Sequence, residues 1–370
     1  MKETINTIYI IVGTRPNFIK ITRFKEVAKQ HKNIKVKIIH TGQHFDHKMS
    51  SIFFQQFNIE PDHIIELSAS SPSTQIAEIM VRLEEIFLID KPGLVMVVGD
   101  VNSTLAGALV ANKMGLLLAH LESGLRSYDT TMPEEWNRIL TDKMADHMFV
   151  TEQSGVDNLL IEKKHPDQIH LVGNTMIDTM LAFDNDIDDS NIMQELRLTQ
   201  KNFILVTIHR PATVDNKEGL RKLIQVINNL PVNYKVVFPV HPRTLKNIAR
   251  FGLEHEIDSL NQLIITEPLD YFSFQKLIKE CKFIITDSGG IQEESTLRNV
   301  PCLTLRPNTE RPVTVTLGTN TLVPFDPEII MKYVTDIENN NYKKGQIPSL
   351  WDGKATERIM AFLSKFFLEV

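Results

Sequence analysis

Short runs of apolar residues alternate with longer amphipathic segments along the whole chain. The runs are continuous in valine, isoleucine and leucine, and polar residues do not alternate with apolar ones inside them. This pattern is typical of strands that are covered on both faces, as in a parallel sheet between layers of helices. The expected strands cover residues 8–12, 36–39, 94–98 and 116–119 in the first half, and 203–207, 236–240, 263–265, 283–285 and 302–305 in the second.

The two halves are separated by residues 183–191, an acidic polar stretch without apolar periodicity that we interpret as a linker. A chain of 370 residues is also longer than one ordinary hydrophobic core supports. We therefore predict an α/β protein with two Rossmann-like, doubly wound parallel-sheet domains, residues 1–182 and 183–352. Residues 353–370 carry apolar side chains at helical spacing, which predicts a terminal helix packed on one domain or across both.

Composition limits the partners that the protein can have. Hydrophobic residues make up 42% of the chain and charged residues 23%, as in soluble globular proteins. The formal net charge of −6 provides no basic field for nucleic acid or anionic lipid. No apolar run approaches the roughly 18 residues of a membrane span, and no signal-peptide core follows Met1, so we expect a cytoplasmic protein. Cys281 and Cys302 lie in apolar, strand-like surroundings and are expected to be buried, reduced thiols.

Residues 283–294 form a pattern suited to holding a phosphate. An apolar run of strand length leads through a turn of small residues into a helix, and Ser288 can cap that helix. Gly289 and Gly290 lack the Cβ atoms that would keep an anion away from the first N–H groups of the helix. An ordinary tight turn between strand and helix is the alternative. Because the pattern comes late in the chain, we expect the second domain to bind the nucleotide.

In doubly wound sheets, ligands bind beyond the carboxyl ends of the strands, so the polar residues that follow the strands are candidates for the site. Carboxylates gather after the strands of the first half, whereas cations and hydrogen-bond donors follow those of the second. A nucleotide-sugar enzyme needs this division, with one domain holding the diphosphate and the other acting on the sugar. The residues are Arg15, Gln43, His44, Asp100, His120 and Glu122 in the first half, and His209, Arg210, His241, Arg243, Asp287 and Ser288 in the second.

Several of these residues also fit structural roles. Asp100 could cap the helix that follows it, and Glu122 could pair with Arg126 on the surface. Glu134 is placed to pair with Arg138 one helical turn later. A metal site is not favoured, because the spacing of the nearest cluster matches no familiar ligand pattern. That cluster is His40, His44, Asp46 and His47.

Taken together, the motifs resemble those of the non-hydrolysing UDP-N-acetylglucosamine 2-epimerases, from about Ile8 to the terminal helix. The resemblance implies the GT-B architecture, with the active site in the cleft between two Rossmann-like domains. It also implies interconversion of UDP-N-acetylglucosamine and UDP-N-acetylmannosamine, and a homodimer. The motifs are Gly13-Thr14-Arg15-Pro16 with Lys20, Gly99-Asp100, Glu122-Ser123-Gly124-Leu125-Arg126, Pro133-Glu134-Glu135 with Asn137-Arg138, Gly173-Asn174 with Asp178, His209-Arg210, Pro239-Val240-His241, residues 287–294 and Thr309-Glu310-Arg311-Pro312.

The hydrogen on C2 of this sugar is not beside a carbonyl group, so inversion needs either transient oxidation or loss of UDP. No G-x-G-x-x-G follows any strand, which argues against a nicotinamide route, and no cofactor is expected. The mechanism ascribed to the family eliminates UDP to 2-acetamidoglucal and then adds it back. By resemblance, Asp100, Glu122 and Glu134 exchange protons, with His209 close to the reacting sugar. The positions expected to bind the UDP-sugar are Arg15, Lys20, Arg138, His241, Phe274 beside uracil, Ser288, Gly289, Gly290, Glu294 at the ribose and Arg311.

One segment departs from the pattern of the allosterically regulated members, which carry a further glutamine where this chain has Phe45 and Asp46. We therefore do not extend allosteric activation by UDP-N-acetylglucosamine to this chain. Residues 41–46 also resemble relatives that act on other UDP-2-acetamido sugars, including 2,3-diacetamido uronic acids. A hydrolysing 2-epimerase, a GT-B glycosyltransferase and a non-enzymatic nucleotide-sugar sensor are further alternatives, each ranked below the non-hydrolysing epimerase.

Overall fold

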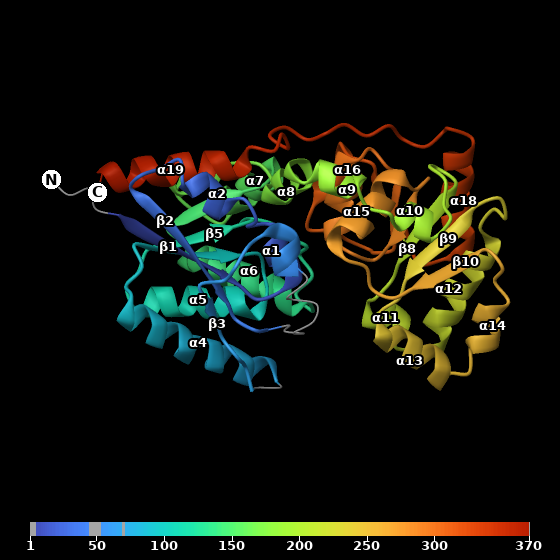
Figure 1. The fold of residues 1–370 in the computed structure, drawn as a ribbon, viewed down its shortest axis with the longest axis horizontal. Coiled ribbons are helices and arrows are strands. Elements are labelled where there is room, and N and C mark those ends of the chain that lie inside the picture. The colour runs from blue at the N-terminus through green and yellow to red at the C-terminus, as the bar shows by residue number, and fades with distance from the viewer. Residues whose placement is uncertain (1–4, 44–52, 69–70, 370) are drawn as a thin grey trace. The chain divides into compact units, whose positions relative to one another are not determined.

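A computed structural model of the chain describes residues 5–43, 53–68 and 71–369. It divides into two compact units (Figure 1). The first consists of Met1–Ala182 together with Ser349–Val370, and the second of Phe183–Pro348. The chain thus leaves the first unit after Ala182 and returns to it at Ser349. The second unit ends at Pro348, four residues before the end that we expected for the second domain.

The sheet of the first unit is parallel throughout, with the strand order β3-β2-β1-β4-β5-β6-β7. The order reverses between β1 and β4, and such a switch point is where open α/β sheets bind ligands. All five residues of β4 are buried, as the continuous apolar run predicts. The strands are β1 (Asn6–Val12), β2 (Ile34–His40), β3 (His63–Ile64), β4 (Leu94–Val98), β5 (Leu118–Leu121), β6 (His147–Val150) and β7 (Ile169–Leu171).

Helices cover both faces of the first sheet. Figure 1 shows α4 and α5 on one side, with α2 and α19 on the other. Gly107 brings α5 close to the strands, because a Cβ atom there would lie 2.6 Å from Ile11 Cδ1. The helices are α1 (Arg15–Ile19), α2 (Phe24–Ala28), α4 (Pro72–Ile89), α5 (Asn102–Lys113), α6 (Pro133–Met144), α7 (Gln153–Ile161), the short 3₁₀ helix η1 (Pro166–Gln168), α8 (Thr175–Ala182) and α19 (Ala355–Glu369).

The sheet of the second unit repeats the arrangement, with the order β10-β9-β8-β11-β12-β13 and a switch point between β8 and β11. Alternate residues of β8 enter separate cores on its two faces, with Ile204 and Val206 in one and Phe203 and Leu205 in the other. The strands are β8 (Phe203–Thr207), β9 (Lys235–Pro239), β10 (Leu263–Thr266), β11 (Ile284–Thr286), β12 (Cys302–Thr304) and β13 (Asn320–Leu322). The helices are α9 (Asp184–Asp188), α10 (Ile192–Glu195), α11 (Pro211–Val214), α12 (Lys217–Asn229), α13 (Pro242–Arg250), α14 (Glu254–Asp258), α15 (Tyr271–Glu280), α16 (Gly290–Leu297), α17 (Pro312–Thr316) and α18 (Pro327–Glu338).

Each of the predicted strands is present, and β4 and β8 match their predicted bounds residue for residue. Four short strands toward the edges of the sheets were not predicted, namely β3, β6, β7 and β13. The division between the two units falls at the start of residues 183–191, which we interpreted as a linker, and this segment contains helix α9 of the second unit. Lys279 of α15 pairs with both Asp184 and Asp188, at 3.3 and 2.8 Å, so ion pairs rather than apolar contacts explain the acidic composition.

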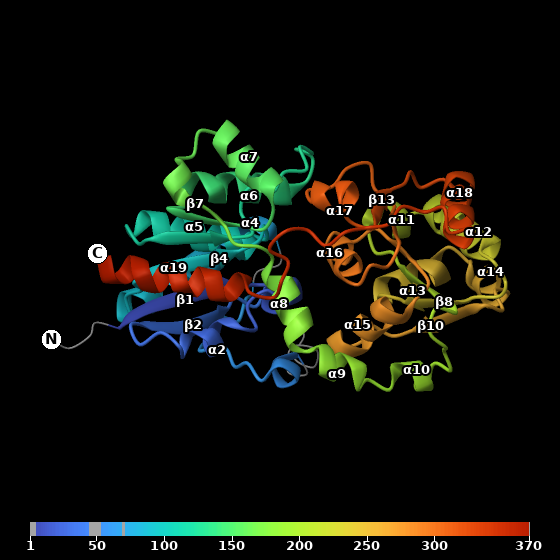
Figure 2. The same ribbon diagram turned by 90° about the horizontal axis from the view of Figure 1, so that it is seen from above.

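The predicted terminal helix is present as α19, and it belongs to the first unit. Figures 1 and 2 show it beside α2 and α8, two helices that it contacts. Asp178 of α8 accepts hydrogen bonds from Ala355 N at 3.1 Å and Thr356 N at 2.6 Å, so a carboxylate distant in sequence caps the helix. Burial raises the pKa of Asp178, against the effect of these hydrogen bonds. The motif residue Asp178 therefore has a structural role.

Two further expectations concern the core and the membrane. Cys281 and Cys302 are buried free thiols, as predicted, and burial raises the pKa of both, that of Cys302 to about 11. Of the helices in the described part of the chain, none has both the length and the apolar character needed to cross a bilayer.

Candidate active site

At the switch point of the first sheet, one asparagine joins the loops that follow β1 and β4. Asn17 Oδ1 accepts hydrogen bonds from Thr14 Oγ1 at 2.9 Å and from Thr14 N at 3.3 Å. Asn17 Nδ2 donates to Val98 O, the last residue of β4, at 3.2 Å. Arg15 follows in the first turn of α1, and its guanidinium carbon lies 4.9 Å from the ring centre of Phe53. The loops that carry Arg15 and Asp100 are therefore held beside each other.

Glu122, directly after β5, has a left-handed backbone with φ of +69°, which is unfavourable for a residue with a side chain. Its carboxylate forms a buried ion pair with Lys20. A Cβ atom on Gly99 would lie 3.5 Å from Glu122 Oε2 and 3.6 Å from Lys20 Nζ, so this pair lies beside the residue that precedes Asp100. The structure thus brings three of the predicted site residues together. Such strain at a charged, buried side chain is typical of functional sites.

The alternative in which Glu122 pairs with Arg126 on the surface is wrong. Arg126 is buried and pairs instead with Asp142 at 2.7 Å and with Glu162 at 2.8 Å. Asp142 also accepts a hydrogen bond from Gly124 N at 3.1 Å. Asp142, a residue of α6, consequently holds the loop that follows Glu122.

The same aspartate reaches the Asp100 loop through His120. His120 Nδ1 lies 2.6 Å from Asp142 Oδ1, and its Nε2 lies 2.8 Å from Gly99 O. Burial acts to raise the pKa of Asp142, but the charges and hydrogen bonds of His120 and Arg126 outweigh it and the pKa is lowered. Asp142 was not predicted as a site residue, because nothing in the sequence pattern of α6 indicates which residue Asp142 faces.

Arg138 of α6 connects Asp100 to the loop before the helix. Its Nη2 donates to Asp100 Oδ2 at 2.7 Å, and its Nη1 donates to Glu135. The alternative in which Glu134 pairs with Arg138 is therefore wrong. The alternative role of Asp100 as a helix cap is also wrong, because Val101 is the N-cap of α5 and Asp100 pairs with Arg138.

Two adjacent glutamates at the start of α6 differ in surroundings. Glu135 is buried and accepts backbone hydrogen bonds from Ser127, at 3.0 Å, and Tyr128, at 2.9 Å. The side chain of Glu134 is partly exposed and makes no hydrogen bond or ion pair with the residues that the structure describes. Glu135 is thus committed to the fold, while Glu134 is available to a ligand.

Gln43, in the loop that follows β2, contacts the first turn of α5. Its Oε1 accepts from Ser103 N at 2.9 Å and from Ser103 Oγ at 2.7 Å, in the first turn of α5. The residues that follow it, His44, Phe45, Asp46 and His47, lie outside the described residues, so their predicted roles are not placed. Within the described ranges, no group of three or more His, Cys, Asp or Glu side chains is arranged to hold a metal ion.

In the second unit, His209 follows β8 and Asp287 follows β11, on either side of the switch point. Asp287 is buried and accepts backbone hydrogen bonds from His209 at 3.1 Å and Arg210 at 2.8 Å. Thr207 Oγ1 and Thr286 Oγ1 lie 2.7 Å apart where the two strands end. His209 and the turn at Ser288 therefore share one edge of the sheet.

The predicted phosphate turn leads into α16, whose first residue is Gly290. The expected capping by Ser288 is wrong: Gly289 is the N-cap, and no side chain caps the helix. A Cβ atom on Gly289 would lie 2.7 Å from Glu310 Oε1 and 3.1 Å from Arg311 Nη1, so the turn packs closely against these charged side chains. The first N–H groups of α16 and the Arg311 guanidinium are thus neighbours.

Arg311 belongs to a buried cluster of ion pairs behind this turn. Its Nε lies 2.8 Å from Glu293 Oε2, and Arg306 Nη2 donates to Glu310 Oε2 at 3.0 Å. Burial lowers the pKa of Arg306. Arg306 was not predicted as a site residue, although it lies just beyond the carboxyl end of β12, a position at which polar residues are candidates for the site. Glu294 is buried on α16.

Two predicted ligand residues have visible structural roles. His241 is exposed and is the N-cap of α13, where its Nδ1 accepts a hydrogen bond from Arg243 N at 3.2 Å. Phe274 is partly buried on α15 and packs against the core that contains Phe203 and Ile284. A contact of either side chain with a nucleotide stays a prediction.

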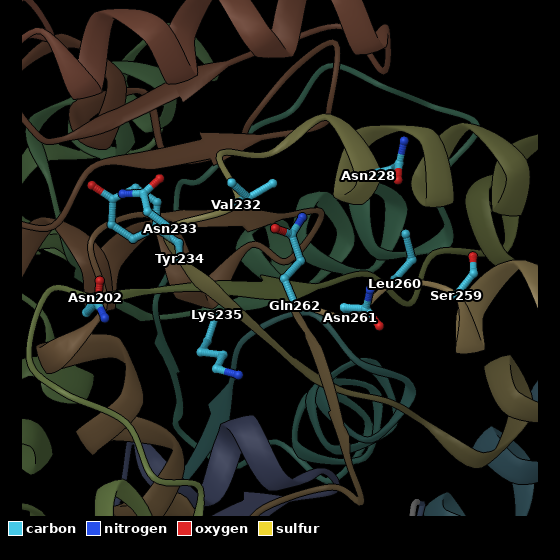
Figure 3. A pocket seen from close by; sticks show the side chains of 10 residues that line it. All are labelled: Asn202, Asn228, Val232, Asn233, Tyr234, Lys235, Ser259, Leu260, Asn261 and Gln262. Atoms are coloured by element: carbon cyan, nitrogen blue, oxygen red, sulfur yellow. The ribbon is translucent and has the colours of Figure 1, made fainter.

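A hollow of about 410 Å³ lies at the amino ends of the strands of the second sheet (Figure 3). It is formed where β8, β9 and β10 begin, whereas His209 and Ser288 follow the ends of strands. Ligands of such sheets bind at the carboxyl ends of the strands, so this hollow is not part of the candidate site. Its lining residues are Asn202, Asn228, Val232, Asn233, Tyr234, Lys235, Ser259, Leu260, Asn261 and Gln262.

Comparison with known proteins decides the family. The profile of the family described as UDP-N-acetylglucosamine 2-epimerase matches residues 26–364. The chain belongs to this family. A UDP-N-acetylglucosamine 2-epimerase of Methanococcus maripaludis is 38% identical over 350 residues, which cover 90% of this chain and 92% of the relative. A UDP-2,3-diacetamido-2,3-dideoxy-D-glucuronate 2-epimerase of Pseudomonas aeruginosa is 35% identical to this chain. The matched residues cover 97% of this chain and 99% of the relative.

Solved structures agree with the family assignment. The crystal structure of Methanocaldococcus jannaschii UDP-GlcNAc 2-epimerase in complex with UDP-GlcNAc and UDP matches with a TM-score of 0.88 and 37% identity, covering 97% of this chain and 99% of that one. The predicted fold class, two Rossmann-like parallel-sheet domains of the GT-B type, is confirmed.

Proposed function

We propose that this chain is a non-hydrolysing epimerase that interconverts UDP-N-acetylglucosamine and UDP-N-acetylmannosamine. The observation that carries the proposal is the buried Lys20–Glu122 pair beside Asp100, at the switch point of the first sheet, in a member of this family. A glycosyltransferase or a nucleotide-sugar sensor of the same fold has no need for this set of carboxylates.

In this proposal the second unit binds UDP. The turn at Ser288, Gly289 and Gly290 directs the first N–H groups of α16 toward the diphosphate, where the helix dipole also favours negative charge. Arg311 adds positive charge behind the turn, and His209 stands at the same edge of the sheet. Glu294 and Phe274 are proposed to contact the ribose and the uracil.

The first unit is proposed to act on the sugar. A carboxylate removes the proton from C2, the electron pair forms the C1–C2 double bond, and UDP leaves with the electrons of the C1–O bond. UDP then returns to C1 of 2-acetamidoglucal, while a second carboxylate delivers a proton to the opposite face of C2. Asp100, Glu122 and Glu134 are the candidates for these transfers. The charges of Arg15, Lys20 and Arg138 offset the negative charge that develops on the departing diphosphate.

A second UDP-sugar should be tested as a substrate. The relative from Pseudomonas aeruginosa, at 35% identity, carries the name of an epimerase of a UDP-2,3-diacetamido uronic acid. Relatives at 38% identity carry the name of UDP-N-acetylglucosamine 2-epimerase, and the difference between these identities is small. Both UDP-sugars should therefore be offered to the enzyme, and the ratio of their kcat/KM values identifies the substrate.

The decisive experiment incubates the purified protein with UDP-N-acetylglucosamine in deuterated water, without added nicotinamide or metal, and follows the products by proton NMR. UDP-N-acetylmannosamine should form with deuterium at C2, and an oxygen-18 label in the anomeric bridge should scramble. Glu122→Gln is the inactive control. Free N-acetylmannosamine as the main product would indicate a hydrolysing enzyme, and the absence of any reaction with either UDP-sugar would refute the proposal.

We also propose that the enzyme works as a homodimer in the cytoplasm. Helix α4 supports self-association, because Val81, Leu88 and Ile89 are exposed on it at 55%, 73% and 88%. Light scattering on the wild-type protein and on a Leu88→Glu variant tests this. A monomeric wild-type protein at micromolar concentration would contradict the dimer.

A further inference from the structure

The sheet places a buried aspartate directly behind His209. Strands β8 and β11 pair in parallel with Thr207 opposite Thr286, and Asp287 N donates to Thr207 O at 3.2 Å. Asp287 therefore lies alongside the loop that begins after Thr207. Its side chain is 1% exposed, whereas that of His209 is 58% exposed. The pair thus has one buried member and one that a ligand can reach.

The carboxylate of Asp287 makes a specific set of contacts. Its Oδ1 lies 2.8 Å from His209 Nδ1. Its Oδ2 accepts from Arg210 N at 2.8 Å, and His209 N lies within 3.2 Å of both oxygens. An ionised carboxylate only accepts hydrogen bonds, so the proton between Asp287 and His209 must belong to Nδ1. In the neutral ring, Nε2 is then the nitrogen with the free lone pair.

We propose that Asp287 is a positioning residue that holds His209 in the Nδ1–H tautomer and presents Nε2 to the diphosphate end of the substrate. Neutral Nε2 accepts a proton or a hydrogen bond, and protonated Nε2 donates to an oxygen of the departing diphosphate. Asp287 stabilises the imidazolium in the second case without touching the substrate. The identity of the ligand rests on the proposed function, whereas the tautomer does not.

If Asp287 had a purely structural role, the tautomer of the His209 ring would not depend on it. The carboxylate could serve only to tie the loop through the N–H groups of His209 and Arg210, and the ring would then be free to choose its tautomer. Asparagine at position 287 separates the two roles. If its amide oxygen faces Arg210 N, its NH₂ group faces Nδ1, which must then accept, and the proton moves to Nε2. If the oxygen faces Nδ1 instead, two donors oppose each other at Arg210.

The first test uses the wild-type protein and needs no variant. Histidine labelled with nitrogen-15 gives separate ring signals for the two tautomers, and a His209→Gln variant identifies the His209 signals among those of the 12 histidines. We expect neutral His209 to carry its proton on Nδ1. A wild-type ring with its proton on Nε2 would overturn the proposal, whatever the protein catalyses.

The second test compares Asp287→Asn with a matched control, Asp326→Asn. Asp326 also accepts two backbone hydrogen bonds, from Glu328 N at 2.9 Å and Ile329 N at 3.1 Å, but it is a helix cap with no histidine partner in the described part of the chain. For Asp287→Asn we expect kcat to fall by about 10–100-fold, a shift of the His209 ring toward the Nε2–H tautomer, and a change in UDP affinity of less than about tenfold. The control should change none of the three.

The outcomes separate this proposal from the proposed function. A wild-type protein that inverts neither UDP-sugar refutes the function, while the nitrogen-15 signals still decide the tautomer. A working epimerase in which Asp287→Asn keeps both the wild-type kcat and the wild-type ring signals would refute the positioning role. Loss of turnover together with the shifted tautomer, at nearly unchanged UDP affinity, would support it.

Discussion

At the scale of single residues, burial decides which of two like side chains serves the fold and which is left for chemistry. Glu134 and Glu135 are adjacent in the first turn of α6, where the positive end of the helix dipole stabilises negative charge. Glu135 turns inward to the N–H groups of Ser127 and Tyr128 and to Arg138, whereas Glu134 stays partly exposed. The two glutamates therefore act as controls for each other.

We expect Glu134→Gln to lower kcat by roughly 10²–10⁴-fold, because the amide keeps the shape but cannot transfer the proton. The same change should leave the melting temperature unaltered. Glu135→Gln should destabilise the protein by about 1–3 kcal/mol, because a buried carboxylate with several donors is replaced by an amide that opposes one of them. Steady-state kinetics and urea unfolding of the two variants check this. Equal effects of both variants on turnover and stability would contradict the assignment.

At the scale of elements, α19 shows how a distant segment becomes part of the first unit. Its N-terminus is held by Asp178, and its aromatic side chains pack against one histidine of β6 and one of β7. The ring centre of His170 lies 4.0 Å from that of Phe362, and the ring centre of His147 lies 4.7 Å from that of Phe366. One buried carboxylate and two imidazole rings thus contact the helix, in addition to its buried apolar side chains Ile359, Met360 and Leu363.

Replacing Asp178 by Asn should destabilise the protein by about 1–2 kcal/mol, because the amide can accept from only one of the two N–H groups that begin α19. Asp352→Asn is the matched control. Asp352 lies just before the same helix but is more exposed, and its ion pair with Arg358 is worth less than about 1 kcal/mol. Thermal unfolding of both variants checks the order. A control variant that is destabilised as much as Asp178→Asn would refute the capping role.

Because His147 and His170 pack against α19, we also expect the folded protein to lose stability in acid. Burial lowers the pKa of His170 to about 4, and burial lowers that of His147 as well. Between the ordinary value near 6.5 and about 4, the unfolded chain binds a proton that the folded chain does not. The stability contributed by neutral His170 is therefore complete above about pH 6.5 and is lost as the pH falls toward 4.

We expect the free energy of unfolding to fall less steeply through this pH window in a His170→Phe variant than in the wild-type protein, as measured by urea titrations at each pH. Phenylalanine suits the site, which is lined by Phe149 and Phe362. His165→Gln, at a side chain that is 70% exposed, is the control and should keep the wild-type slope. Identical slopes for His170→Phe and the wild type would show that the ring is not held neutral by burial.

At the scale of the whole molecule, each unit has its own sheet and its own hydrophobic cores. The second unit is a continuous segment, whereas the first is completed by residues that return to it after Pro348. The proposed division of labour therefore coincides with a division of the chain. Nucleotide binding is assigned to the continuous segment and proton transfer to the discontinuous one.

A protein comprising residues 183–348 alone should fold and bind UDP within about tenfold of the affinity of the full chain, but should not turn over UDP-sugars. Calorimetry and the NMR assay check this. A Gly290→Val variant of the same segment is the control for specific binding, because a branched side chain beside the first N–H groups of α16 should exclude the diphosphate. A folded segment without measurable UDP affinity would contradict the assignment of the nucleotide to this unit.

The sequence by itself determined the kind of the main elements and the order in which they alternate. Continuous apolar runs require strands buried on both faces, and their alternation with amphipathic segments requires parallel sheets covered by helices. The same rule placed Arg15, Asp100, Glu122 and His209 beyond the carboxyl ends of strands, since parallel strands present those ends at one edge. These conclusions depend only on local patterns of burial, which a linear sequence records.

The tertiary structure alone decided which charged groups face each other. Lys20 pairs with Glu122 across 102 positions of sequence, and Asp178 caps a helix 177 positions away, and no local pattern encodes such distances. The acidic residues of α9 resembled a linker because the lysine that pairs with them comes from a distant helix. The tautomer of His209 is likewise set by Asp287, a residue that reaches it only because β8 and β11 are neighbours in the sheet. Partners brought together by the fold, rather than residue type, determine what each titratable side chain does.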